Sequence, residues 1–530
     1  MSALAGTRHL VRLILRRDRV LLPLWVLLLG VLPMSYATSF AEFYPTAAER
    51  AAYVAGTGSN PSIVALLGPV HGDSIGALTA QRGGFLSLVI GLASLLTVIR
   101  HTRTEEEAGR RELLGATVLG RHAGLTAALA VTYAANLLLG LLTAAGLSAT
   151  GLPAAGSLAY GLSAALVGVV FATVGGLAAQ LTEAAGGARG IGVTVLGVAF
   201  VLRLAGDTAE RDWLSWLSPL GWAPRVRAFA GEQWWVLALP VALSVLLAVV
   251  AYPVSARRDL GAGLLPPRLG PAAAGPALAG PLGLAWRLHR GQLLGWSVGF
   301  GLLGLILGGA AEAAGKAVEG NAQLAEIMAR LGGADALAEA YLGATLGFVG
   351  LAAAGYGIQA ALRMRSEETA GRAEPLLATG VSRSRWVASH LVFALVGPVV
   401  VLAVAGLCTG AAYGASVGDV PGQMPRMLGV ALAQVPAAWV LAGLAVLLYG
   451  LLPRFAGAAW AALALCVLLG QVGAVLELSQ WLMDLSPFTH TPQVLHDDWV
   501  ATPLLALTAL ALLLTTTGLT ALRRRDLPTP

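Results

Sequence analysis

The run from residue 123 to residue 182 decides the fold: A-G-L-T-A-A-L-A-V-T-Y-A-A-N-L-L-L-G-L-L-T-A-A-G-L-S-A-T-G-L-P-A-A-G-S-L-A-Y-G-L-S-A-A-L-V-G-V-V-F-A-T-V-G-G-L-A-A-Q-L-T. It contains no Asp, Glu, Lys or Arg, and a turn motif at Ser148–Pro153 divides it. A helix needs about 20 apolar residues to cross the hydrocarbon core of a bilayer. The run therefore predicts two membrane spans joined by a tight turn.

Outside this run, charge-free stretches of similar character recur along the whole chain. Only 12% of the 530 residues are charged, whereas soluble chains carry roughly 25%. The shortest stretch, 190–202, is expected to extend past Arg203, whose side chain could snorkel outward. The sequence therefore predicts an all-α membrane protein of about twelve transmembrane helices. The further spans are 20–41, 83–99, 190–202, 233–256, 291–311, 340–362, 386–418, 427–453, 455–476 and 499–522.

The positions of Lys and Arg predict the orientation of the chain. With the N-terminus inside, the inner segments carry 25 of the 34 basic residues. Cytoplasmic loops are enriched in basic residues, so both termini are predicted to be cytoplasmic and the protein to be multi-pass in the plasma membrane. Because the basic residues are concentrated in these cytoplasmic loops, nucleic-acid binding is not expected. Cys408 and Cys466 both fall in predicted spans and suggest neither a disulfide framework nor a metal site.

The chain also repeats itself. Residues 103–121 (R-T-E-E-E-A-G-R-R-E-L-L-G-A-T-V-L-G-R) and 365–383 (R-S-E-E-T-A-G-R-A-E-P-L-L-A-T-G-V-S-R) are identical at 11 of 19 positions without gaps. The motif W-L-S-W-L-S-P at 213–219 likewise matches W-L-M-D-L-S-P at 481–487. Each half holds six spans, so the halves are parallel repeats. We predict a first half at 1–255, a Pro/Gly/Ala-rich cytoplasmic linker at 256–290 and a second half at 291–530.

The repeated inner loop has the pattern of a short capped helix. Thr104 and Glu107 fit a capping box, and Ser366 could cap the second copy. In each copy a glutamate, Glu106 or Glu368, precedes an arginine by four residues, which favours an ion pair on a helix. A glycine follows at the same place in both copies. Glycine is unfavourable inside a helix, so its repetition suggests that another surface approaches there.

This layout resembles the permease subunits of type-2 ABC exporters, specifically the fused two-half form of the polyketide-antibiotic exporter family. The resemblance covers essentially the whole chain, and the E-E-x-A-G-R-x-E signature of the inner loop is its most specific part. It implies that residues 103–114 and 365–376 are coupling helices that dock on an ATPase subunit. Pro375 stands where the first copy has Leu113, so the two docking sites are expected to differ. The implied docking residues are Arg103, Glu105, Glu106, Gly109, Arg110, Glu112, Arg365, Glu367, Glu368, Gly371, Arg372 and Glu374.

The sequence lacks the parts needed to bind ATP itself. Gly315-Lys316 is followed by Ala317 rather than Ser or Thr, and Ala310 replaces the first glycine of a P-loop. We therefore expect no catalysis by this chain and no cofactor bound by it. ATP and Mg²⁺ would bind a separate nucleotide-binding ATPase, expected as a homodimer. The predicted function is export of small lipophilic, antibiotic-like compounds across the lipid bilayer.

Other functions stay open. An ion-coupled secondary transporter would carry ionisable residues inside its spans, but Glu183, Arg203 and Glu477 lie at predicted span ends and His390 near an inner end. A lipid or polysaccharide ABC exporter permease is a second alternative. A membrane sensor or lipid-modifying enzyme is a third.

The transport path is expected between the two halves, because substrate sites of repeat-built transporters lie at the repeat interface. Polar residues inside spans are the candidates, although helix–helix hydrogen bonding explains such residues equally well. These candidates are Asn136, Gln180, Gln359, Gln434 and Gln471. The outer tryptophans are typical of interfacial anchors. Alternatively, together with the Ser-Pro pairs, they form a gate at the outer exit. The gate candidates are Trp213, Ser218, Pro219, Trp481, Ser486 and Pro487. Residues 4–19 predict an amphipathic helix on the inner leaflet.

Overall fold

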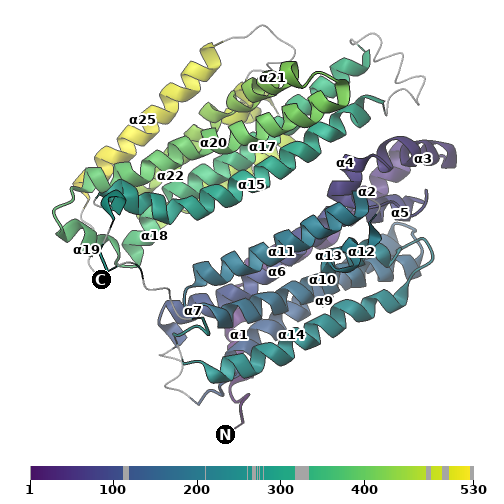
Figure 1. The fold of residues 1–530 in the computed structure, drawn as a ribbon, viewed down its shortest axis with the longest axis horizontal. Helices are drawn as coiled ribbons and strands as arrows, with labels where there is room; N and C mark the ends of the chain where they lie inside the picture. Colours follow the sequence, from purple (N-terminus) through teal and green to yellow (C-terminus); the bar gives the residue numbers. More distant parts are fainter. Residues whose placement is uncertain are drawn as a thin grey trace. The chain divides into compact units, whose positions relative to one another are not determined.

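The protein is helical throughout the part of the chain that its structure describes (Figure 1). This computed structural model describes residues 2–111, 118–208, 211–259, 261–265, 270, 272–273, 275–278, 280–316, 333–472, 479–491 and 501–525. Within these ranges, eleven helical segments are long and apolar enough to span a membrane, and a twelfth apolar helix, Ala458–Gly470, is shorter. The prediction of an all-α multi-pass membrane protein is therefore confirmed. The cytoplasmic placement of both termini stays a prediction, and "inner" and "outer" below follow it.

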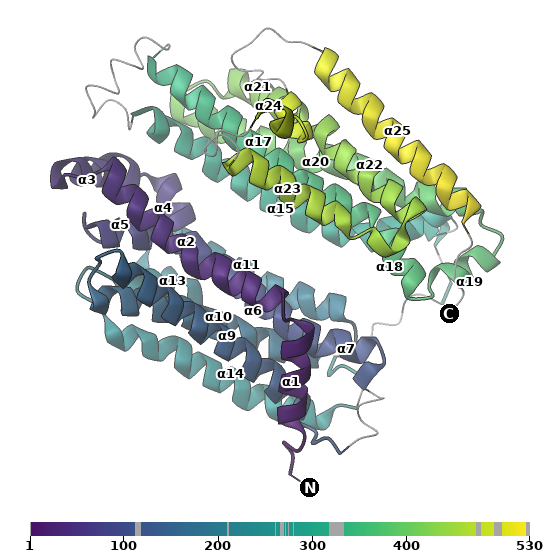
Figure 2. The ribbon, with the colours of Figure 1, turned by 180° about the vertical axis from the view of Figure 1, so that it is seen from behind.

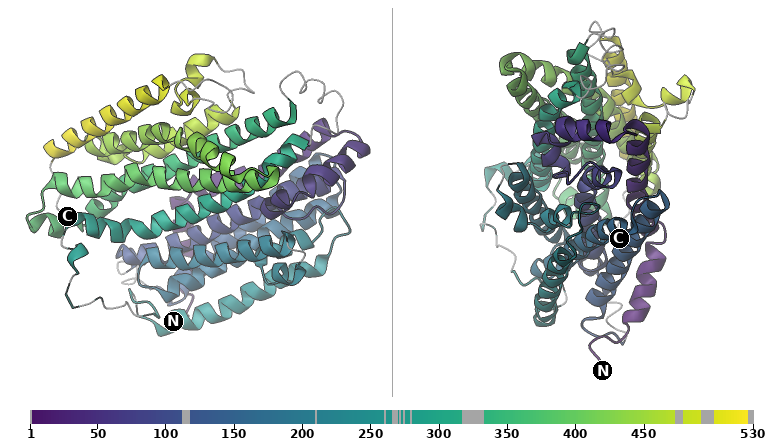
Figure 3. Two further views of the ribbon diagram at one scale, coloured as in Figure 1. Left: turned by 45° about the horizontal axis from the view of Figure 1, so that its top comes forward. Right: turned by 90° about the vertical axis from the view of Figure 1, so that its right-hand side faces the viewer.

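The chain divides into two compact units, residues 1–270 and 271–530. Each unit is a bundle of long helices running roughly along one another (Figure 3). The long helices of unit 1 are α2 (Leu21–Phe43), α6 (Gly84–His101), α9 (Ala123–Ala149), α10 (Ala154–Leu181), α11 (Ala185–Thr208) and α14 (Ala238–Arg257).

Shorter helices cover both ends of the unit 1 bundle. At the inner end, the amphipathic α1 packs against α9 through Ile14 (Figure 2). The short elements of unit 1 are α1 (Thr7–Arg17), α3 (Ala47–Tyr53), η1 (Val54–Gly58), α4 (Pro61–Leu67), α5 (Ile75–Arg82), α7 (Arg103–Glu107), α12 (Asp212–Trp216), α13 (Pro219–Arg225) and η2 (Trp234–Leu237). The helix predicted within residues 4–19 is thus confirmed over Thr7–Arg17, and its position on the inner leaflet stays a prediction.

Among the described residues, unit 2 has five span-length segments and the shorter apolar helix within α23. The fourth of these segments is interrupted at Ala433 and Gln434. The elements are η3 (Pro276–Leu278), α15 (Pro281–Lys316), α17 (Gly333–Ala361), α18 (Arg363–Thr369), α19 (Ala373–Ala378), α20 (Arg383–Val417), α21 (Val420–Leu432), α22 (Val435–Leu451), η4 (Pro453–Phe455), α23 (Ala458–Val472), α24 (Gln480–Met483), η5 (Pro487–His490) and α25 (Thr502–Arg524).

Small residues let the spans of each unit approach closely. A Cβ atom added to Gly161 would lie 2.2 Å from the carbonyl oxygen of Gly140, so α10 and α9 touch backbone to backbone. In unit 2, a Cβ on Gly450 would lie 2.2 Å from the carbonyl oxygen of Gly518, between α22 and α25. Close backbone approach at Gly and Ala is the usual way that helices pack in a bilayer, where hydrophobicity does not drive them together.

The fifth span, α11, extends past Arg203 as predicted, but its arginine behaves differently from the prediction. Arg203 does not snorkel outward: it is 2% exposed and donates to the carbonyl oxygens of Ala65 (2.6 Å) and Leu66 (2.8 Å). These carbonyls belong to the last turn of α4, which has no further helical donors to satisfy them. Arg203 therefore joins the outer segment to α11, and Asp207 lies one turn further along at 3.7 Å.

Candidate functional site

The repeated inner loop begins with a short helix in each unit, but its capping differs from the prediction. The N-cap of α7 is Thr102, which makes no side-chain capping bond. The prediction of a capping box between Thr104 and Glu107 is therefore wrong. The Glu107 carboxylate instead accepts from the backbone N–H of Ala185, at 3.0 Å, and so satisfies a free donor at the start of α11. Ser366 lies inside α18 and donates to a backbone carbonyl, so the cap predicted there is wrong too.

The repeated glycine ends the short helix in each loop. Gly109 has φ of 69° and Gly371 has φ of 68°, both in the left-handed region. A Cβ at Gly109 would meet no other atom of this chain within 4 Å. Glycine is preferred after a helix end because it adopts this conformation without steric penalty. The positive φ therefore accounts for the glycine in both loops, and the approach of a partner surface stays a prediction.

The turn changes which residues form ion pairs. Arg110 donates to both oxygens of Glu105, at 2.8 and 2.9 Å, and Arg372 donates to Glu367 at 2.7 and 3.3 Å. The predicted pairs of Arg110 with Glu106 and of Arg372 with Glu368 are wrong, because the chain leaves the helix before the arginine. Glu112, another implied docking residue, lies outside the described residues.

The second glutamate of each loop points into the protein. Glu106 accepts from Arg258 at 2.8 and 2.9 Å, and Glu368 accepts from Arg525 at 2.7 and 2.6 Å. Sequence reasoning missed these arginines. The signal was present, because R-R-D-L follows the last span of each half, at 257–260 and again at 524–527.

The implied docking residues therefore divide into an inward and an outward group. Arg103, Glu105, Glu106 and Glu367 are buried, and Arg365, Glu368, Gly109 and Gly371 are half-buried. The outward-facing members are Arg110, Arg372 and Glu374. Docking of a partner on either loop stays a prediction, and the side chains available for it are the exposed ones.

The polar residues proposed for the transport path are mostly engaged within their own unit. Asn136 is fully buried, donates to Ser94 at 2.9 Å and so links α9 to α6. Gln359 accepts from the indole N–H of Trp296 at 3.1 Å, and the carboxamide oxygen of Gln434 is buried without a partner. Gln180 accepts from Arg258 at 2.8 Å at the inner end of α10. The side chain of Gln471 lies outside the described residues.

The outer Ser-Pro pairs start short helices, as their sequence suggests. Ser218 is buried and accepts from two backbone N–H groups at the start of α13, where Pro219 is the first residue. Ser486 accepts from a backbone N–H at the start of η5, which begins at Pro487. Serine at the N-cap followed by proline is a favoured helix start. Trp213 is 61% and Trp481 68% exposed, which fits interfacial anchoring. Whether these segments gate an exit stays a prediction.

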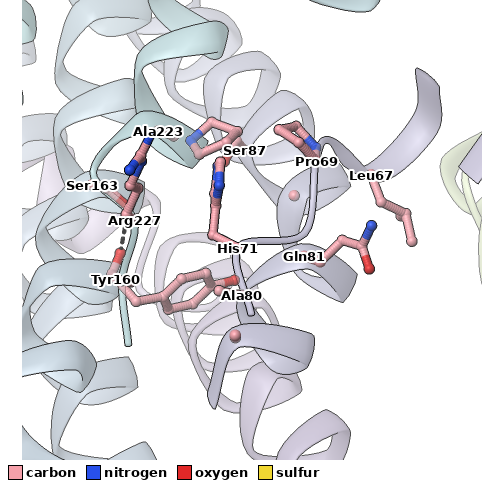
Figure 4. Close-up of a pocket in the computed structure, with 14 residues that line it drawn as sticks. Leu67, Pro69, His71, Ala80, Gln81, Ser87, Tyr160, Ser163, Ala223 and Arg227 are labelled. Atoms are coloured by element: carbon pink, nitrogen blue, oxygen red, sulfur yellow. Dashed lines mark hydrogen bonds between the residues drawn. The ribbon is translucent and has the colours of Figure 1, made fainter. Parts of the chain in front are cut away.

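Beneath the outer segment of unit 1 lies a small cavity of mixed polar and apolar lining (Figure 4). His71, Gln81, Tyr160 and Arg227 line it, and Nε2 of His71 is buried without a partner. Burial lowers the pKa of His71, and the guanidinium groups of Arg227 and Arg225 lower it further. His71 is therefore neutral at pH 7, because an ordinary histidine pKa of about 6.5 is already below that value.

These two bundles of apolar helices define a multi-pass membrane protein. A family model described as "Multidrug efflux system permease Rv1217c, C-terminal domain" matches residues 278–523. The chain is also 46% identical over 526 residues to the multidrug efflux system permease protein Rv1217c of Mycobacterium tuberculosis, covering 99% of this chain and 96% of that protein. The chain therefore belongs to the family of the multidrug efflux permease Rv1217c, and it is a multi-pass protein of the cell membrane.

Proposed function

We propose that the chain is the membrane subunit of an ATP-dependent type-2 ABC exporter that moves lipophilic, antibiotic-like compounds out of the cell. A separate ATPase homodimer would bind ATP and Mg²⁺ and dock on the two repeated loops. The family relationship to a multidrug efflux permease supports the export of drug-like compounds.

The recurrence of one loop geometry in both units carries the docking proposal. In each unit a glycine at φ near 70° closes a short helix and leaves an exposed arginine held by a buried glutamate. The arginine side chains keep 51% and 53% of their surface exposed, so each offers a charged, preoriented contact. Two copies of one contact suit a partner that is itself two-fold symmetric.

Charge reversal of the exposed arginines tests this proposal. Arg110→Glu together with Arg372→Glu should reduce co-purification of a co-expressed P-loop ATPase at least tenfold while membrane insertion stays normal. Glu106 and Glu368 are unsuitable for this test, because they are held inside the protein and their loss would disturb the loop itself. Arg454→Glu is the matched control, since Arg454 is exposed in another inner loop. An unchanged complex in the double variant would refute docking at these loops.

One observation favours the alternative of proton coupling. His289 and His390 are buried, and their ring nitrogens lie 3.0 Å apart between α15 and α20. Buried ionisable residues inside spans are candidate proton relays. If efflux were proton-driven, His289→Gln with His390→Gln would abolish it and dissipating the proton gradient would stop it while ATP persists. Under the ABC proposal, efflux instead follows ATP and survives loss of the gradient. Efflux assays with lipid or polysaccharide substrates would distinguish the lipid or polysaccharide exporter from an exporter of antibiotic-like compounds.

A further inference from the structure

A buried three-residue cluster joins the inner loop of unit 1 to two of its spans. The guanidinium of Arg258 donates to both oxygens of Glu106 and, through Nε, to the carboxamide oxygen of Gln180 at 2.8 Å. The side chains of Glu106 and Arg258 are only 3% and 6% exposed. Because Gln180 lies near the end of α10 and Arg258 follows α14, the cluster holds the loop, the fourth span and the sixth span together.

Unit 2 contains a corresponding cluster built partly from other residues. Arg525, which follows α25, donates through the single nitrogen Nη2 to both oxygens of Glu368, and the Tyr449 hydroxyl donates to Glu368 at 2.5 Å. The guanidinium carbon of Arg525 also lies 5.0 Å from the centre of the Tyr449 ring. Tyr449 lies near the end of α22, the fourth span of this unit. We call each cluster an inner clasp: Glu106–Gln180–Arg258 and Glu368–Tyr449–Arg525.

The two inner clasps occupy equivalent places in the repeat. Their glutamates are at the same position of the repeated loop, and their arginines are at the same position of the R-R-D-L motif. The third member differs, a glutamine in one half and a tyrosine in the other, yet both contact the Glu–Arg pair. The same three elements are therefore joined in each half despite the divergence of the spans.

Stability alone is a poor explanation for a buried ion pair. Removing two charges from water is unfavourable, and well-packed apolar residues in their place are often neutral or stabilising. In unit 1 the bidentate Glu106–Arg258 pair provides fixed geometry, because two guanidinium nitrogens match the carboxylate in one orientation. In unit 2 one nitrogen of Arg525 and the Tyr449 hydroxyl together orient Glu368. Glu106 has additional donors in Arg103 at 3.0 Å and the backbone N–H of Gly261 at 3.1 Å, which orient it further.

We infer that the inner clasps are positioning contacts that carry movement of each repeated loop into the fourth and sixth spans of its own half. This inference rests on the proposed function, in which a partner ATPase moves the loops. A loop that is tied to the span ends by a directional contact cannot move without them.

Substituting lysine for both clasp arginines tests the inference. Arg258→Lys with Arg525→Lys keeps the charge but removes the planar guanidinium. Arg258 then loses its two-nitrogen contact with Glu106 and its Nε contact with Gln180, and Arg525 loses its guanidinium contact with the Tyr449 ring. The adjacent Arg257 and Arg524 are exposed, so Arg257→Lys with Arg524→Lys is the matched control. In proteoliposomes that contain the co-purified ATPase, we expect the clasp variant to keep ATP hydrolysis within twofold of wild type. Its ATP-dependent drug efflux should fall at least tenfold, whereas the control variant keeps both activities.

Three results would overturn the inference. Normal efflux in the clasp variant would show that the geometry is not needed for transport. Loss of ATPase co-purification would show that the arginines act in docking or folding. Equal losses in the control variant would show a general effect of inner arginines. These results differ from those expected if the proposed function itself is wrong. In that case the wild-type chain would neither bind the ATPase nor require ATP for efflux.

Discussion

Gly109 and Gly371 hold backbone conformations that other residues reach only at an energetic cost. Alanine in the left-handed region costs about 1 kcal/mol, so Gly109→Ala with Gly371→Ala should lower the free energy of opening each loop by roughly that amount. Because 1.4 kcal/mol is about tenfold, amide hydrogens of residues 103–111 should exchange about fivefold faster. Hydrogen exchange measured by mass spectrometry checks this.

The control for this change is another glycine with open space around it. A Cβ on Gly190, in α11, meets nothing within 4 Å, and its φ is not positive. Alanine is favoured over glycine inside a helix, so Gly190→Ala should leave exchange unchanged or slower. Faster exchange in both variants would mean that the loop effect does not arise from the left-handed conformation.

His71 makes the outer segment of unit 1 sensitive to acid. Its pKa is lowered in the folded protein by burial and by Arg227 and Arg225, against the opposing effect of Asp207 and Asp212. The unfolded state therefore binds the proton first as pH falls below about 6.5, so this contribution to stability is full above that pH and lost below it.

A glutamine at this position should remove that dependence. His71→Gln is expected to lose less thermal stability than wild type between pH 7.5 and pH 5.0, because glutamine cannot be protonated in this range. Thermal unfolding in detergent at several pH values measures the difference. Identical pH dependence in both proteins would show that protonation of His71 has no effect on folding.

Between elements, the contact of α9 with α10 depends on the absence of side chains. Since a Cβ on Gly161 would lie 2.2 Å from the Gly140 carbonyl, Gly161→Ala must push the helices apart. Overpacking of this kind costs about 1–3 kcal/mol, so the thermal unfolding midpoint in detergent should fall. Gly197→Ala is the comparison, because a Cβ there meets nothing within 4 Å. A similar fall in both variants would argue against close packing as the cause.

The sequence predicted the spans well and the inner loops less well, for a physical reason. A span must satisfy its backbone hydrogen bonds internally, so a charge-free run of sufficient length nearly determines a helix. The loops depend on one turn: once Gly109 takes a positive φ, Arg110 reaches Glu105 instead of Glu106. The fate of Arg203 was missed because its partners, the carbonyls of α4, are far away in sequence.

For the whole molecule, the internal repeat was the most informative signal, and it led to the loops but not to the inner clasps. The loop identity is local and visible at a constant offset. The clasp requires three segments separated along the chain, and its third member is Gln180 in one half and Tyr449 in the other. Gln180 was accordingly placed on the transport path, where its polar character in an apolar span fits equally well. Only the folded chain brings it to Arg258.

Under the proposed function, the two repeated loops would bind a symmetric partner at two sites. An ATPase homodimer that seats on both loops would bind more tightly than either contact alone, because the second contact forms at high effective concentration. Arg110→Glu and Arg372→Glu should therefore each weaken ATPase binding to the permease in nanodiscs, and the double variant should weaken it beyond either. The loops are not identical, since Pro375 lies within α19 of the second one, so the two single effects need not be equal in size. Binding kinetics with immobilised permease measure all three variants. If one single variant matched the double variant while the other bound like wild type, the partner would use one loop only, and the duplicated geometry would need another explanation.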